Sequence, residues 1–207
     1  MVDAYLAASA QAGALVDEGL LECFQVVLEA LDPTLRSIAA RRAGLGGEPL
    51  TLQELGDEFG VSRERIRQLE SRLCEQLARQ PWTVEARRRI DAAVARGPVP
   101  FATLASDRWW AAASERPSAV AFIVESVLGH DVSVIELDDA PWLARQKATA
   151  ITAAFGELVS AAGRIQLPGP LEVFEALATQ AATAFGPHVA AYFRDELRGR
   201  LQLDDGP

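Results

Sequence analysis

Four arginines fall within ten residues of this chain, together with a glutamate and a glutamine at helical spacing: Arg63, Glu64, Arg65, Arg67, Gln68 and Arg72. In a DNA major groove, arginine can donate two hydrogen bonds to guanine, glutamine can pair with adenine, and glutamate can accept from cytosine. Arg63 and Glu64 would stand in the first turn of a helix, which is the part that enters the groove. The competing interpretation is a solvated helix in which Glu64 pairs with Arg67 or Gln68.

The charge of the chain is distributed unevenly. The net charge is −9, yet residues 33–90 hold 11 arginines and 8 acidic residues, while the remainder holds 9 basic and 21 acidic residues. This balance argues against a protein that binds any polyanion. It predicts that DNA contact is confined to the basic segment and weakens with salt.

The stretch "LQELGDEFGVSRERIRQLE", residues 52–70, meets the requirements of a helix-turn-helix. Such a motif needs a small residue where the helices meet and a turn residue that tolerates positive φ. Gly56 and Gly60 supply these two positions. The residues predicted to face inward are Leu55, Phe59, Val61, Ile66 and Leu69. This combination favours a helix-turn-helix over an ordinary solvated helix pair.

Capping signals set the predicted helix boundaries. Thr51 with Glu54 three residues later forms a capping box, and Ser62 is a good N-cap for a second helix that runs to about Arg79. Upstream, apolar spacing predicts helices over residues 15–31 and 34–43 and a loop at 44–49.

The later segments predict a mainly α fold with at most one small β-hairpin. Helical segments are expected over 87–94, 101–110 and 117–128, before a β-branched run at 132–137, a turn "DDAP" and a short strand "WLA". That order is typical of a winged helix, and the last third is helical. The predicted divisions are an N-terminal segment 1–17, a helix-turn-helix domain 18–82, a winged-helix-like domain 83–146 and a helical domain 147–207.

The run "LDPTLRSIAARRAGLGGEPLTLQELGDEFGVSRERIRQLESRLCEQLAR" resembles region four of the bacterial sigma-70 family, the domain that reads the −35 promoter element. The resemblance covers roughly residues 18–80. It implies base contacts from Arg63, Glu64 and Gln68. It implies phosphate contacts from Arg42, Leu52, Gln53, Ser62, Arg65, Arg67 and Arg72. In that family the same domain also packs on a flap of RNA polymerase, so a polymerase contact is implied too.

The chain also departs from the family pattern. About 17 residues precede the recognised segment and about 125 follow it, whereas a sigma factor has an upstream domain for the −10 element. Gln53 replaces the usual glutamate and Ala43 an aromatic residue. We therefore expect a sequence-specific DNA-binding transcription regulator that is not a complete sigma factor. The alternative is an adaptor that docks on RNA polymerase, or an accessory subunit of a DNA-processing or defence complex. Because one small reading helix seldom binds tightly by itself, dimerisation or a protein partner is expected as well.

No catalytic arrangement, cofactor motif or metal site is expected. Cys23 and Cys74 are too few for a disulfide framework or a four-ligand metal site, and His130 and His188 are far apart with no cysteine nearby. The tryptophans have acidic or neutral neighbours and are expected to pack in the core. The N-terminus lacks the basic residues of a secretory signal, and no apolar run approaches the roughly 20 residues that span a bilayer. We therefore expect a cytoplasmic protein that is not an enzyme.

Overall fold

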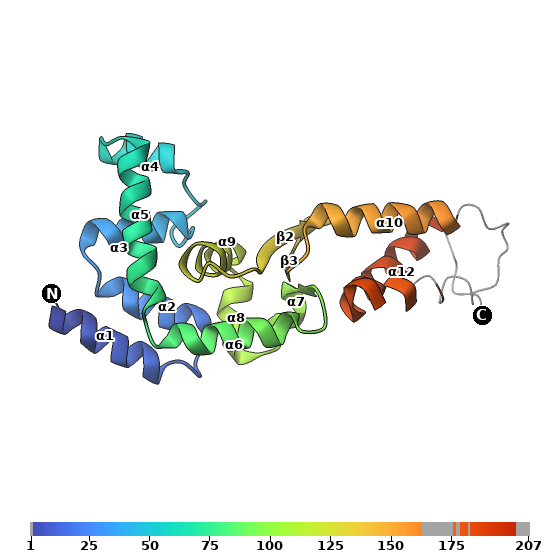
Figure 1. Cartoon of the computed structure of the whole chain (residues 1–207), viewed down its shortest axis with the longest axis horizontal. Coiled ribbons are helices and arrows are strands. Elements are labelled where there is room, and N and C mark those ends of the chain that lie inside the picture. The colour runs from blue at the N-terminus through green and yellow to red at the C-terminus, as the bar shows by residue number, and fades with distance from the viewer. Residues whose placement is uncertain (1, 163–175, 177–178, 182, 202–207) are drawn as a thin grey trace. The chain divides into compact units, whose positions relative to one another are not determined.

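The computed structural model describes residues 2–162, 176, 179–181 and 183–201. It is mainly α-helical with one three-stranded sheet, as the sequence predicts (Figure 1). The chain divides into two compact units. The first unit comprises the residues up to 92 together with 101–134, and the second comprises 93–100 together with the residues from 135 onward.

Five helices open the first unit: α1 (Val2–Ala14), α2 (Leu20–Glu29), α3 (Pro33–Arg42), α4 (Leu52–Phe59) and α5 (Arg63–Ala78). The helix predicted over 15–31 begins only at Leu20, and α1 packs against it. Leu20, Phe24 and Leu28 of α2 are buried because their spacing of four puts them on one face. Between α2 and α3, the Asp32 side chain accepts a hydrogen bond from the Thr34 N–H at 2.9 Å and caps α3.

The helix-turn-helix signals act as predicted. The Glu54 carboxylate accepts from the Thr51 N–H at 2.7 Å, and the Thr51 hydroxyl accepts from the Glu54 N–H at 3.3 Å. Gly60 ends α4 in the left-handed region, with φ 65° and ψ 32°. Ser62 caps α5 by accepting from the Arg65 N–H at 3.1 Å. A Cβ on Gly56 would lie 2.8 Å from the Val61 carbonyl oxygen, so this position requires glycine.

The predicted inward set is correct except at one position. Leu55 and Ile66 are fully buried, and Phe59 and Leu69 are half-buried. Val61 is 40% exposed, so the prediction that it packs beneath the turn is wrong. Its backbone N–H donates to the Gly56 carbonyl oxygen at 2.9 Å, which means that the backbone of Val61, and not its side chain, makes the contact with α4.

Further helices follow: α6 (Trp82–Val94), which belongs to the first unit up to residue 92, and α7 (Phe101–Leu104), α8 (Arg108–Ser114), α9 (Pro117–Ala121) and the π-helix η1 (Phe122–Val127), which lie wholly within it. Helix α8 packs on α2, and η1 packs on α5. The rings of Phe24 and Phe122 lie 6.1 Å apart, and the Trp109 indole donates to the Val16 carbonyl oxygen at 2.9 Å. Trp109 and its neighbour Trp110 are buried, as expected for core tryptophans.

The sheet contains β1 (Val99–Pro100), β2 (Ser133–Leu137) and β3 (Ala140–Ala144) in the order β1-β3-β2. Strand β1 is antiparallel to β3, with Val99 opposite Leu143. Asp138 and Asp139 form the predicted turn between β2 and β3 and have positive φ values of 47° and 57°. The hairpin was predicted, whereas β1 was not. Helices thus precede the β2–β3 hairpin in the chain, which is the order of a winged helix. That residues 83–146 form a winged-helix-like domain stays a prediction.

Helices α10 (Ala148–Ala162) and α12 (Pro187–Leu201) belong to the second unit. Its core is formed by Leu137, Trp142, Ile151, Phe155, Ala181, Val189 and Phe193. Most of the helix predicted over 169–185 lies outside the described residues. Among the described helices, none is both long and apolar enough to cross a membrane.

Candidate nucleic-acid interface

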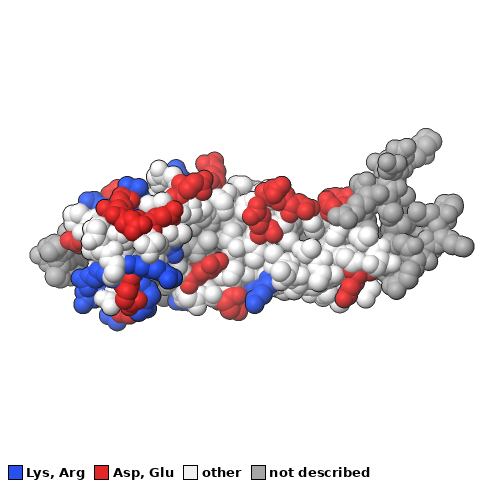
Figure 2. All heavy atoms as spheres, turned by 90° about the horizontal axis from the view of Figure 1, so that it is seen from above, with Lys and Arg blue, Asp and Glu red and all other residues white. Residues whose placement is uncertain are grey.

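Helix α5 presents the predicted base-reading residues to solvent. Arg63, Glu64, Arg67 and Gln68 are all exposed, while Ile66 on the opposite side of the helix is fully buried. Figure 2 shows basic side chains gathered on the end of the first unit that carries α4 and α5, mixed with acidic ones. Within its own unit, the face of α5 that would meet DNA is therefore uncovered.

Glu64 is the centre of a small hydrogen-bonded cluster on this face. Arg67 donates to both of its carboxylate oxygens, from Nε to Oε2 at 2.8 Å and from Nη2 to Oε1 at 2.7 Å. The Gln68 amide adds a longer bond to Oε1 at 3.4 Å. The hydrogen bond from Arg67 lowers the pKa of Glu64, which keeps this carboxylate ionised and able only to accept. The solvated ion pair and the predicted base-contacting set thus share residues. A base that bonded to Glu64 would have to displace its internal partners.

A shallow hollow lies beside the first turn of α5, and we call it the α4 hollow. It is lined by Arg42, Thr51, Leu52, Gln53 and Arg63. The backbone N–H groups at the start of α4 and the two guanidinium groups make this a setting suited to an anion. The structure therefore brings three of the predicted phosphate-contacting residues, Arg42, Leu52 and Gln53, next to Arg63. Gln53 is exposed, and its amide donates to Asp57 at 2.9 Å.

Arg42 has a structural role that the sequence does not reveal. Its Nε donates to Glu70 Oε1 at 2.6 Å, and its Nη1 donates to the Leu50 carbonyl oxygen at 2.7 Å. The side chains of Arg42 and Glu70 are 26% and 14% exposed. Arg42 therefore links α3 to α5 and to the segment before α4, and only part of its guanidinium remains available to a ligand. Glu70 is the residue that the sequence-based selection of site residues missed.

A second groove runs along the other side of α5, and we call it the α3–α5 groove. It is lined by Asp32, Thr34, Leu35, Arg65, Leu69, Arg72, Glu75, Gln76 and Arg79. Arg65, Arg72 and Arg79 recur every seven residues, so they share one face of the helix. Arg65 and Arg72 make no ion pair within the described part of the chain. These two predicted phosphate-contacting residues are thus apart from the α4 hollow.

The rotation of the helix places these groups in order around α5. Successive residues turn by about 100°, so Glu64 and Gln68 fall between Arg63, which lines the α4 hollow, and the arginines of the α3–α5 groove. The strip of predicted base-contacting residues (Arg63, Glu64 and Gln68) is flanked by predicted phosphate-contacting residues on both sides. Ser62 lies at the start of the strip, and its hydroxyl already accepts from the Arg65 N–H.

Comparison with known proteins matches this part of the chain. The family model "Sigma-70, region 4" matches residues 27–79. Residues 27–79 form a sigma-70 region 4 domain. The RNA polymerase sigma-C factor of Myxococcus xanthus is 43% identical over 70 residues, which are 34% of this chain and 23% of that protein. The SigA sigma factor of Nostoc is 42% identical over 59 residues, 28% of this chain and 15% of that protein.

The chain thus matches less than a quarter of the length of these relatives, in the same region as the region 4 domain. The SigA factor of Microcystis aeruginosa is likewise 42% identical over 59 residues, which are 28% of this chain and 14% of that protein. No solved structure matches the chain significantly. Region 4 is a DNA-binding helix-turn-helix of sigma factors, and this domain keeps that architecture. In the first unit its helices are packed against the later helices α8 and η1.

Proposed function

We propose that this protein is a sequence-specific DNA-binding transcription regulator that reads duplex DNA through α5, and that it does not act as a complete sigma factor. The observation that carries the proposal is the exposed strip of Arg63, Glu64 and Gln68 on the second helix of a region 4 domain. The matches to sigma factors cover about a third of this chain or less, so the likeness to them is limited to the part that contains this domain.

In the proposed complex, the first turns of α5 enter the major groove. Arg63 and Gln68 donate to base edges, and Glu64 exchanges Arg67 for a base amino group. The backbone of one strand lies at the α4 hollow, where Arg42, Leu52 and Gln53 contact phosphate. On the other side of the strip, Arg65 and Arg72 of the α3–α5 groove contact the opposite backbone. Ser62 at the start of α5 and Arg67, which lies between Arg63 and Glu64 around the helix, also contact phosphate. Phosphate contacts fix the position of α5, while the base contacts supply specificity.

The decisive experiment selects duplexes from a random pool with the full-length protein and then titrates the selected duplex against a scrambled one. A variant with Arg63→Ala and Gln68→Ala should lose the preference for the selected duplex. Each lost base contact is expected to weaken specific binding by about fivefold to 150-fold. Arg88→Ala is the matched control because it removes one exposed arginine from α6, where it pairs with Glu85. If the double variant binds the selected duplex as the unaltered protein does, α5 does not read the bases.

A second candidate function is a protein-docking module for RNA polymerase, or for another complex that acts on DNA. Two observations favour it: the relatives are RNA polymerase sigma factors, and residues outside 33–90 carry 21 acidic side chains against 9 basic ones. Gel filtration of the protein with purified RNA polymerase, without DNA, tests this candidate. Light scattering tests the dimer that we propose on the ground that one reading helix binds weakly. If the protein is a monomer that does not bind RNA polymerase but still binds the selected duplex, the result supports the DNA-binding regulator and not the docking module.

A further inference from the structure

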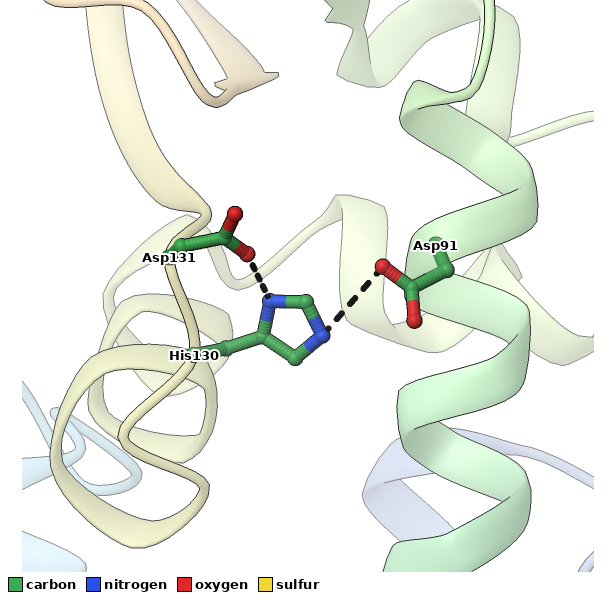
Figure 3. Close-up of side chains that lie close together, drawn as sticks. All are labelled: Asp91, His130 and Asp131. Carbon is green, nitrogen blue, oxygen red and sulfur yellow. Dashed lines mark ion pairs between the residues drawn. The ribbon is translucent and has the colours of Figure 1, made fainter.

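An aspartate of α6 meets two consecutive residues that lie just beyond the end of η1. His130 follows this helix, Asp131 is its neighbour in the chain, and Asp91 lies on α6, all within the first unit (Figure 3). The Asp91 Oδ1 atom is 3.5 Å from His130 Nε2, and the Asp131 Oδ1 atom is 2.8 Å from His130 Nδ1. The imidazole is thus placed between two carboxylates.

The His130 side chain is buried, but one of its two ring nitrogens lacks a hydrogen-bond partner in the described part of the chain. The side chain is 8% exposed, and among the described residues Nδ1 has no hydrogen-bond partner, even though Asp131 lies close to it. The Asp131 oxygen therefore sits off the direction in which a ring N–H would donate. Buried polar atoms in native proteins are almost always satisfied by protein, water or an ion. A lone pair on Nε2 facing the Asp91 carboxylate would be unfavourable unless a proton or a cation lay between the two atoms.

The spacing at Nε2 is suited to a metal ion. Two donor atoms bound to a tetrahedral Zn²⁺ at about 2.0–2.1 Å lie roughly 3.3–3.4 Å apart. The 3.5 Å between His130 Nε2 and Asp91 Oδ1 is close to this value, whereas 2.8 Å between Nδ1 and Asp131 is shorter. A metal-bound histidine commonly gives its other ring nitrogen to a carboxylate, which fixes the tautomer and the ring orientation. The Asp131 oxygen lies 2.8 Å from Nδ1, and it would take this role once the carboxylate turned into line with the ring N–H.

We propose that His130 Nε2 and Asp91 bind a divalent transition-metal ion, for which Zn²⁺ is the best match, and that Asp131 orients the imidazole. Asp91 and Asp131 are 52% and 68% exposed, so solvent reaches the site and water completes the coordination. Two protein ligands make an exchangeable site of modest affinity. The sequence-based expectation of no metal site did not include Asp91, because only the fold brings Asp91 next to His130.

The bound ion would fasten α6 to the segment that leads into β2. One helical turn before Asp91, the Arg87 guanidinium already donates to the Leu128 carbonyl oxygen at 2.5 Å. The ion and this hydrogen bond would hold the end of η1 at two successive turns of α6. Metal binding should therefore stabilise the folded first unit, since a ligand that binds only the native state raises its stability.

The test is a calorimetric titration of the full-length protein with Zn²⁺, repeated with Co²⁺ by absorption spectroscopy, with a thermal melt at each step. The expected result is one ion per chain, a higher melting temperature, and reversal of both by EDTA. His130→Ala should abolish binding. His188→Ala is the matched control because it removes the only other histidine of the chain, and it should bind as before. Asp91→Asn should weaken binding more than Asp131→Asn, for which a loss of about tenfold is expected.

His130→Gln provides a second variant of similar shape if the alanine variant does not fold, which circular dichroism reports. In the unaltered protein, imidazole NMR signals should shift with Zn²⁺ for one of the two histidines, and the His188→Ala variant identifies which. Lack of Zn²⁺ binding by the folded protein overturns the proposal, as does binding that survives in His130→Gln. A melting temperature that depends on pH but not on Zn²⁺ would show that only a proton occupies the space between His130 and Asp91.

Discussion

Replacement of Gly56 by alanine tests the geometry on which the whole interface depends. An ideal Cβ at this position lies 2.8 Å from the Val61 carbonyl oxygen and 3.3 Å from the Arg63 N–H nitrogen. Both are backbone atoms, so no flexible side chain can move away. The α4–α5 turn would have to shift, and with it the residues that begin α5.

Two opposing effects set the magnitude. Alanine in place of glycine inside a helix is favourable by about 1 kcal/mol, because the unfolded chain loses less conformational freedom on folding. Overpacking a close contact costs about 1–3 kcal/mol, and this contact is shorter than a normal Cβ contact and involves rigid backbone, which favours the upper part of that range. We expect a net loss of about 1–2 kcal/mol. For a protein of this size this corresponds to a fall in melting temperature of roughly 2–8 °C.

The assay compares Gly56→Ala with Gly156→Ala by thermal melting and by DNA titration. Gly156 lies inside α10, and an added Cβ there meets nothing within 4 Å. The same substitution should therefore stabilise α10 slightly and leave DNA binding unchanged. Gly56→Ala should lower both the melting temperature and the affinity for the selected duplex, because Arg63 and Glu64 move with the turn. If Gly56→Ala melts at or above the temperature of the unaltered protein, the close approach of the two helices is not as described.

Three further predictions follow from named contacts. Glu70→Gln should destabilise the domain by about 1–3 kcal/mol in a chemical unfolding experiment, because it removes the charge that faces the half-buried Arg42 guanidinium; unchanged stability would show that the pair is dispensable. Hydrogen bonds from Arg88 and then Arg89 lower the pKa of Glu85 from 4.5 to about 2, so the stabilisation is complete above pH 4.5 and is lost as the pH falls towards 2. Melts at several acidic pH values should therefore show a weaker pH dependence in Glu85→Gln, and identical curves would contradict the assignment. Arg72→Ala should reduce the slope of log affinity against log salt by about 1 for every duplex tested; a loss confined to one sequence would instead mean that Arg72 reads bases.

The helix-turn-helix could be predicted because its determinants are local. The capping box of Thr51 and Glu54, the left-handed Gly60 and the N-cap Ser62 each act within a few residues. Such signals do not depend on the rest of the fold. Val61 was predicted wrongly because the apolar pattern gives residue type and spacing, but not the direction of a side chain in a turn.

The features that were missed depend on contacts between distant residues. Strand β1 is two residues long and exists only because it pairs with β3. Helix α1 is rich in alanine and has little apolar periodicity, so its sequence gave no clear helical signal. Glu70 lies 2.6 Å from Arg42, and Asp91 lies 3.5 Å from His130, yet no spacing rule joins either pair. Local patterns therefore predicted the helix-turn-helix correctly, whereas the Arg42–Glu70 pair and the Asp91–His130 pair required the tertiary structure.

The acidic character of the chain is consistent with a selective DNA-binding surface. Glu64 carries a negative charge in the middle of the proposed reading strip, where it would repel a phosphate backbone. In the free protein Arg67 compensates that charge, and on DNA only a base amino group in the right place can take over this role. On a duplex of the wrong sequence, Glu64 would either stay paired with Arg67 and make no base contact, or lose Arg67 and have no hydrogen-bond donor in its place. With 21 acidic residues outside the basic segment, attraction to DNA in general is weak, so a correct match at α5 would decide whether the protein binds.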